Sequence, residues 1–220
     1  MTWLERHITL QMYDDSRAER ENALTHFLGL ALSLAGLALV VNHLDNARDS
    51  AVGAGMIVFA VCNILLYAAS GFYHCLRPGN AKRICRVLDH SNIYFLIAGT
   101  YTPLLMYAGT DAAFHLAVFM WLTAIAGIAF TIFFWDRFKA VHLMLYLLMG
   151  WTIVFFWQDI IPHLPRPVLG WLLAGGIIYS AGVVFYAMKK LPHYHSIWHL
   201  FVLAGSLCFY FGLYSNLLAN

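Results

Sequence analysis

The residues best suited to chemistry are three histidines, a serine and an aspartate. His195 and His199 are four residues apart, and so are Ser70 and His74. Residues four apart lie on one face of a helix, so each pair would present two polar groups in the same direction. Asp89 is an isolated acid at the start of an apolar segment. These five residues are the candidate site.

Three imidazoles with a nearby carboxylate are the groups expected of a zinc site. Zinc takes four ligands, and catalytic sites keep one position for water or substrate. Imidazole suits transition metals better than it suits calcium or magnesium. His74, His195 and His199 would supply three nitrogens, Asp89 would act as general base, and Ser70 would orient water or a substrate oxygen. The alternatives are histidines bonded to backbone or water, and an acid placed by the helix dipole.

The elements that position these residues are predicted to be membrane-spanning helices. The chain is 61% hydrophobic and 11% charged, whereas a soluble domain carries about 25% charged residues. So few charges cannot cover the surface of a soluble protein of 220 residues. The net charge of +2 gives no indication of a nucleic-acid partner.

Seven apolar segments are long enough to cross a bilayer, which requires about 20 helical residues. Helices are expected because each satisfies its own backbone hydrogen bonds within lipid. The predicted spans are residues 22–43, 52–75, 88–108, 112–134, 141–158, 168–188 and 196–217. We therefore expect an all-α, polytopic membrane protein, with a charged cytoplasmic tail over residues 1–20 and a seven-helix domain over residues 21–220.

The basic residues predict the direction of the chain, because cytoplasmic loops are enriched in Lys and Arg. With the amino terminus in the cytoplasm and the carboxyl terminus outside, only Arg48 and Arg166 lie on the outer side. The other eleven of the 13 basic residues lie on the inner side: Arg6, Arg17, Arg20, Arg77, Lys82, Arg83, Arg86, Arg137, Lys139, Lys189 and Lys190.

That direction places the candidate residues at one depth. The second span ends at the cytoplasm with Ser70 and His74, and the seventh begins there with His195 and His199. The third span also begins there, with Asp89 expected in its first turn. The spacing of the histidines was not used to find the direction, so two separate arguments lead to one site near the inner surface.

Five short motifs, in this order, resemble those of the bacterial haemolysin III branch of the progestin and adiponectin Q receptor family. They are ENALTH (21–26), SGFYH (70–74), DHSNIY (89–94), IAGTYTP (97–103) and HSIWH (195–199). The resemblance covers about residues 19–215 and implies seven helices with a cytosolic amino terminus.

The resemblance also implies roles for individual residues. It implies zinc held by His74, His195 and His199, with Asp89 contacting metal-bound water and Ser70 beside the site. Glu21, Asn22 and His26 match a further family motif and are expected to brace the first helix near the site.

The wider superfamily includes ceramidases, which favours a lipid as substrate. The leading hypothesis is a zinc-dependent hydrolase of the plasma (inner) membrane that cleaves an amide or ester bond in a membrane lipid and contributes to lipid homeostasis. The second is a non-enzymatic membrane-fluidity sensor in which zinc is structural and Asp89 is a fourth ligand. A pore-forming hemolysin is favoured least, since no predicted span carries a continuous polar stripe. The sequence leaves protein partners unknown.

Overall fold

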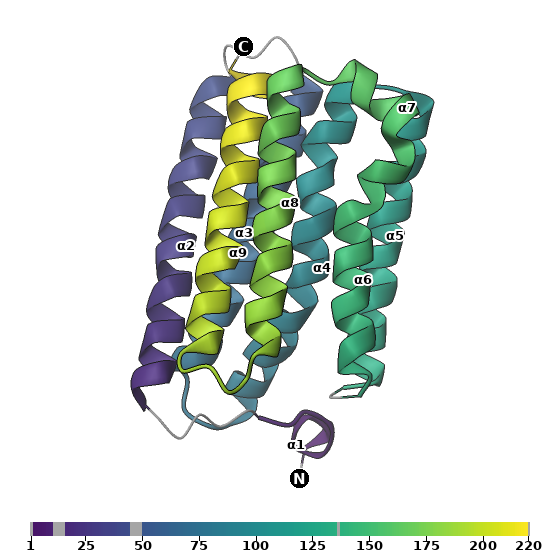
Figure 1. Cartoon of the computed structure of the whole chain (residues 1–220). Helices are drawn as coiled ribbons and strands as arrows, with labels where there is room; N and C mark the ends of the chain where they lie inside the picture. The colour runs from purple at the N-terminus through teal and green to yellow at the C-terminus, as the bar shows by residue number, and fades with distance from the viewer. Residues whose placement is uncertain (1, 11–15, 45–49, 136, 220) are drawn as a thin grey trace.

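The computed structural model describes residues 2–10, 16–44, 50–135 and 137–219, and within these ranges the regular structure is helical. Figure 1 shows a bundle of long, roughly parallel helices, with the carboxyl terminus at one end and the amino terminus at the other. The short helix α1 (Trp3–His7) lies beneath the bundle at the amino-terminal end.

The long helices follow one another up and down the bundle. They are α2 (Ser16–Leu44), α3 (Ser50–Cys75), α4 (Asn80–Ala108), α5 (Asp111–Phe133) and α8 (Arg166–Ala187). Between α5 and α8, α6 (Lys139–Trp151) continues through the 3₁₀ turn η1 (Thr152–Phe156), α7 (Trp157–Ile160) and the turn η2 (Ile161–His163). Last in the chain, α9 (Tyr194–Leu213) runs into the π-helical turn η3 (Tyr214–Leu218).

Six of these helices or helical runs are long and apolar enough to cross a membrane: α2, α3, α5, the run from α6 to η2, α8, and α9 with η3. The predicted all-α membrane fold is therefore confirmed. Each of the seven expected spans coincides with helical structure in the described residues, but α4 is not among the six apolar ones. Its side chains Lys82, Arg86, Asn92 and Thr102 are buried within the protein. Polar side chains buried between helices do not face lipid, so they are compatible with a helix inside a membrane bundle.

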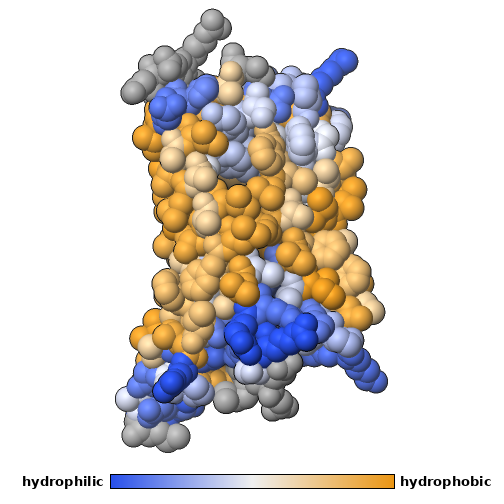
Figure 2. Space-filling model, turned by 90° about the vertical axis from the view of Figure 1, so that its left-hand side faces the viewer, coloured by the Kyte–Doolittle hydropathy of each residue, from blue (hydrophilic) through white to orange (hydrophobic). Residues whose placement is uncertain are grey.

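The outer surface has the pattern expected of a protein in a bilayer. In Figure 2 a wide hydrophobic band separates two hydrophilic ends. Large apolar side chains such as Leu32, Phe119 and Phe155 are exposed in this structure. A continuous band of such side chains marks a surface that lipid covers.

Glycines set how closely the helices approach, as is common among membrane helices. A Cβ atom at Gly55 of α3 would lie 2.7 Å from Pro103 Cα of α4, so these backbones touch. Four glycines lie at the contact between α8 and α9, and an aromatic residue of the opposite helix packs against each of them: Gly175, Gly182, Gly205 and Gly212. In contrast, a Cβ atom at Gly150 or Gly170 would have no neighbour within 4 Å, so packing is looser there.

Candidate metal centre

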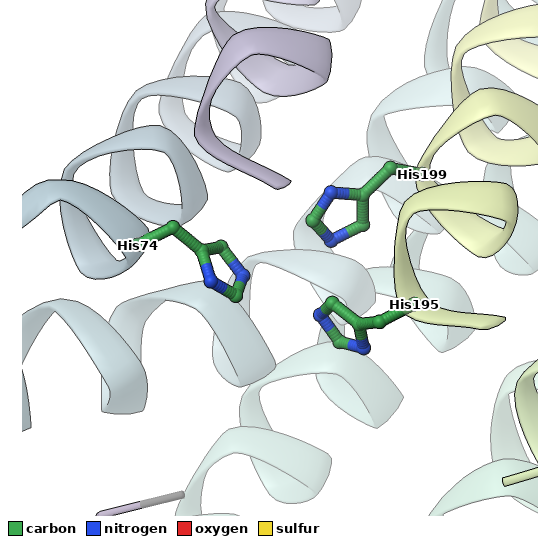
Figure 3. A group of neighbouring side chains, drawn as sticks. All are labelled: His74, His195 and His199. Atoms are coloured by element: carbon green, nitrogen blue, oxygen red, sulfur yellow. The ribbon is translucent and has the colours of Figure 1, made fainter. Parts of the chain in front are cut away.

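Three imidazoles that the sequence singled out converge at one end of the bundle. His74 lies in the last turn of α3, while His195 and His199 lie in the first turns of α9. One ring nitrogen from each lies within 4.8 Å of the others. Figure 3 shows His74 facing the two histidines of α9 across a common space. The predicted grouping of these three residues is therefore present in the structure.

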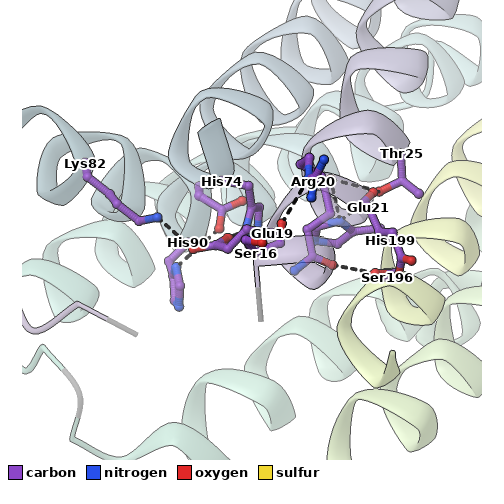
Figure 4. A network of polar contacts seen from close by, with 12 residues as sticks. Ser16, Glu19, Arg20, Glu21, Thr25, His74, Lys82, His90, Ser196 and His199 are labelled. Atoms are coloured by element: carbon purple, nitrogen blue, oxygen red, sulfur yellow. Dashed lines mark hydrogen bonds and ion pairs between the residues drawn. The ribbon is translucent and has the colours of Figure 1, made fainter. Parts of the chain in front are cut away.

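His74 is held by a carboxylate. Its Nδ1 atom lies 2.5 Å from Glu19 Oε2, and the other oxygen of Glu19 accepts a hydrogen bond of 2.8 Å from Lys82 Nζ. Figure 4 shows this chain of contacts from α4 through α2 to α3. A carboxylate only accepts when ionised, so the contact favours a proton on Nδ1. His74 would then bind a metal through Nε2, the arrangement in which a carboxylate orients a histidine ligand.

His199 is held by groups of α2. Its Nδ1 atom lies 3.2 Å from the carbonyl oxygen of Asn22 and 3.1 Å from Thr25 Oγ1. Since a carbonyl oxygen can only accept, the proton belongs on Nδ1 and Nε2 is again the atom for a metal. Ser196 Oγ donates to Asn22 Oδ1 over 2.6 Å and ties the same turn of α9 to α2.

The turn before α9 is held in an uncommon backbone conformation. His193 has φ of 58°, in the left-handed region that non-glycine residues seldom adopt. Its Nδ1 atom lies 2.5 Å from Glu21 Oε2, and Glu21 also pairs with Arg17 Nε at 2.9 Å. Glu21 and Asn22 therefore both fix the start of α9, which agrees with the expected bracing by the first helix.

His26 packs directly on the candidate metal centre. Its ring stacks on that of His199 with 3.5 Å between centroids, and it meets Tyr67 edge-on at 5.2 Å. The side chain is buried, and neither ring nitrogen has a hydrogen-bond partner among the described residues. The ring of His26 therefore covers one side of the candidate metal centre.

Ser70 and Asp89 are both near the centre but differ in position. Ser70 lies one turn before His74 on α3 and is fully buried, and its Oγ has no hydrogen-bond partner in the described part of the chain. Asp89 lines a cavity together with His195 and His199 but is not a member of the group that could hold one ion. Its Oδ2 lies 3.7 Å from His90 Nδ1.

The expectation that Asp89 lies in the first turn of its helix is wrong. Helix α4 begins at Asn80, nine residues earlier, because Glu19 pairs with Lys82 and Thr9 accepts from Arg86 in this polar extension. The helix dipole acts mainly within the first turn, so it does not account for Asp89.

The cavity beside the centre has a volume of about 790 Å³. Its walls come mainly from α4, α6, α8 and α9. Its polar residues include His142 and His195, in the first turns of α6 and α9, and Asp89, nine residues after the start of α4. Toward the opposite end the walls become apolar, with residues such as Ile97, Leu104 and Leu169. A cavity of this size suits a small molecule with a long apolar part.

The donor set fits a transition metal. Three neutral imidazoles are a known catalytic zinc set, and two of them have Nδ1 held by an oxygen acceptor. The orphaned hydroxyl of the buried Ser70 is a further polar group on the helix of His74. The residues therefore fit a metal with three protein ligands.

Comparison with known proteins identifies the family. The family described as "Haemolysin-III related" matches residues 15–210. The chain belongs to this family. It is 38% identical to Hemolysin-3 of Bacillus cereus over 89% of the chain and 90% of that protein. It is 39% identical to the Hemolysin-3 homolog of Bacillus subtilis over 89% of the chain and 92% of that protein.

More distant relatives confirm the link to the progestin and adiponectin Q receptor group. The human monocyte to macrophage differentiation factor is 28% identical over 89% of the chain and 83% of that protein. The chain is a multi-pass membrane protein, in keeping with the plasma membrane expected for a bacterial haemolysin-III-related protein.

Sequence reasoning on this haemolysin-III-related chain missed Glu19 and Lys82. The sequence prediction placed Glu19 in the charged tail. In the structure α2 begins at Ser16 and includes Glu19, whose carboxylate contacts His74. The signal was present: Glu19, Asn22 and His26 have the i, i+3, i+7 spacing of one helix face. Lys82 lay outside the predicted span and offered no comparable pattern.

Proposed function

We propose that this protein is a zinc-dependent hydrolase of a membrane lipid, cleaving an amide or ester bond. The observation that carries the proposal is the convergence of three imidazole nitrogens, within 4.8 Å of one another, beside a cavity that Asp89 also lines. A metal set, a carboxylate and an apolar cavity are the three parts that such a reaction needs.

The residues have separate roles in the proposed reaction. His74, His195 and His199 would hold zinc, which when bound supplies a Lewis acid for the carbonyl oxygen and favours ionisation of water. Asp89 accepts the proton of the attacking water and returns it to the leaving nitrogen or oxygen. Ser70 donates its hydroxyl proton to hold the water or the substrate oxygen.

The cavity supports a lipid as substrate. Its apolar walls follow α4 from Asp89 to Leu104, which is about 22 Å at 1.5 Å per residue. An acyl chain lying along these walls would place its carbonyl end at the imidazoles. The same arrangement argues against a wide aqueous pore, because most of the lining is apolar. The hemolysin in the relatives' names is therefore not the activity proposed here.

A catalytic site is favoured over a structural one by the position of Asp89. A structural zinc needs a closed set of four ligands. Asp89 is outside the group formed by the three histidines among the described residues. The set of three leaves a coordination position for substrate or water.

We further propose seven spans, with α4 as the seventh, and the amino terminus in the cytoplasm. The distribution of basic residues supports this direction, and the common depth of the candidate residues supports the alternation of the seven spans. Cys75 is exposed at the end of α3, on the side assigned to the cytoplasm. In a variant with Cys75 as its only cysteine, a membrane-impermeant maleimide should label inverted vesicles and not intact cells. Labelling of intact cells would reverse the direction.

The main test combines metal content with lipid turnover. Purified protein should contain about one zinc ion per chain, and the folded His195→Ala/His199→Ala variant should contain none. The metal-loaded protein should hydrolyse members of a panel of ceramides, phospholipids and lysophospholipids. Asp89→Asn should retain the metal and lose at least about 100-fold in turnover.

Each failure has its own meaning. Protein that is folded but takes up no metal would overturn the zinc site. A full metal content with no turnover of any lipid on the panel would overturn the hydrolase and favour the structural role of zinc in a membrane sensor. Asp89→Asn with unchanged turnover would remove Asp89 from the reaction.

A further inference from the structure

Cations gather around the polar end of the cavity. Arg86 of α4, Arg137 just after α5 and Lys189 just after α8 all line it. Asp89 is the one carboxylate among the described lining residues. The cavity is therefore basic at the end that holds the imidazoles and apolar along the rest of its length.

These cations differ from two others at this end of the bundle. Lys82 pairs with Glu19, and Arg17 pairs with Glu21. In contrast, no carboxylate within the described ranges lies at ion-pair distance from Arg86, Arg137 or Lys189. The described lining of the cavity thus carries three cations, Arg86, Arg137 and Lys189, against one carboxylate, Asp89.

Arg86 is the decisive residue, since exposed basic residues such as Arg137 and Lys189 are common in loops at a membrane surface. Arg86 is only 6% exposed. Its Nη1 donates to the carbonyl oxygen and the hydroxyl of Thr9, and the guanidinium lies 5.3 Å from the ring of Trp135. Its Nε has no hydrogen-bond partner among the described residues. A buried charge without an opposite charge is costly, so an anionic ligand is expected beside it.

Arg86 is also close to the metal centre. It lines the same cavity as His195 and His199. A group bound to Arg86 would therefore lie beside the reacting bond of a lipid in the cavity. Guanidinium groups bind phosphate and carboxylate through paired hydrogen bonds, which favours an oxyanion over other ligands.

We propose that the basic end of the cavity is a headgroup site for an anionic lipid, with Arg86 as its main contact. The ligand is an acyl lipid whose headgroup carries a phosphate or a carboxylate. This inference rests on the proposed function for the idea that the ligand is a substrate, but binding at the headgroup site does not depend on turnover.

The test measures binding of three single-chain lipids of equal chain length: lysophosphatidylglycerol, lysophosphatidylcholine and the free fatty acid. Bromine atoms on the chain would quench Trp151, Trp157 and Trp198, which line the cavity. Wild type should bind lysophosphatidylglycerol at least about tenfold more tightly than lysophosphatidylcholine, as expected for hydrogen bonds to a charged group. Equally tight binding of the fatty acid would show that a carboxylate suffices, and weak binding would assign the site to phosphate.

Arg83 provides a matched control. Its Nε donates to the carbonyl oxygen of Ile8 over 3.1 Å, so it too holds the amino-terminal segment, but it does not line the cavity. Arg86→Gln should abolish most of the preference for the anionic lipid. The loss should be larger for lysophosphatidylglycerol than for lysophosphatidylcholine, because the choline of the latter already weakens its binding beside Arg137 and Lys189. Arg83→Gln should retain the preference. The exposed pair Arg137→Gln/Lys189→Gln should reduce it by a smaller factor and covers the case in which Arg86→Gln does not fold.

Two results would overturn the headgroup site: equal affinity of wild type for both lysolipids, or the same loss in Arg83→Gln as in Arg86→Gln. These results are distinct from failure of the proposed hydrolase. Anion-selective binding without turnover would remove the hydrolase and keep the site. Turnover of zwitterionic lipids without anion-selective binding would remove the headgroup site and keep the hydrolase.

Discussion

The two sides of α4 are built differently. On the side of α3, which we call the closed side, the backbones touch at Gly55 and Pro103, and His74 is held by Glu19. On the side of α6 and α8, the open side, a cavity of about 790 Å³ lies between the helices, and Gly170 has no neighbour for a Cβ atom. The closed side can hold imidazoles still, while the open side leaves room for a ligand.

Charge follows the same division. Two acids of α2 at this end of the bundle, Glu19 and Glu21, each contact an imidazole and a cation. The cations of the open side have no such partners among the described residues. Positioning of His74 and the proposed binding of a headgroup thus involve different cations of α4, Lys82 and Arg86.

The largest effect is expected from the carboxylate that holds His74. Glu19→Gln should weaken zinc binding by about 10- to 100-fold, because loss of such a partner leaves a ligand poorly oriented. Competition with a chromophoric chelator measures the affinity, and the absorption of bound Co²⁺ reports the ligand geometry. A changed cobalt spectrum in a folded variant would separate orientation of the ligand from general stability.

Glu21→Gln is the control for this change. Glu21 is two residues away on the same helix and also contacts an imidazole at 2.5 Å, but its partner, His193, is not in the metal group. The Glu21→Gln variant should lose less zinc affinity than Glu19→Gln, because Glu21 holds the turn before α9 and not a member of the metal group. An equal loss in both variants would mean that the closed side acts only through general packing of α2.

A smaller effect is expected from packing on the two sides. Gly55→Ala should lower the free energy of unfolding by about 1–3 kcal/mol, because its Cβ atom would meet the backbone of Pro103. Gly170→Ala should raise it by about 0.5–1 kcal/mol, since the new methyl group meets nothing and alanine is the better helix former. Unfolding in detergent with increasing denaturant measures both, and equal effects would remove the distinction between the sides.

Much of the site could be predicted from local spacing. Residues four apart lie on the same face of a helix in any fold. The pairs Ser70 with His74 and His195 with His199 could therefore be predicted from the sequence alone. Asp89 was also identified, but its depth in α4 was misjudged. The polar residues before it are typical of a loop, and only their burial against Glu19 and Thr9 makes them helical.

The sequence by itself determined that this protein is a bundle of membrane helices and which three histidines could share a metal. The helices and the histidine pairs depend on composition and on the period of a helix, which are local, and the alternation of spans brings His74 to the end that carries His195 and His199. Only the tertiary structure decided that Glu19 orients His74, that Arg86 lies at a cavity without an acidic partner among the described residues, and that the two sides of α4 differ. The reason is that these features depend on how neighbouring helices are rotated and spaced, and side chains far apart in sequence set that arrangement together.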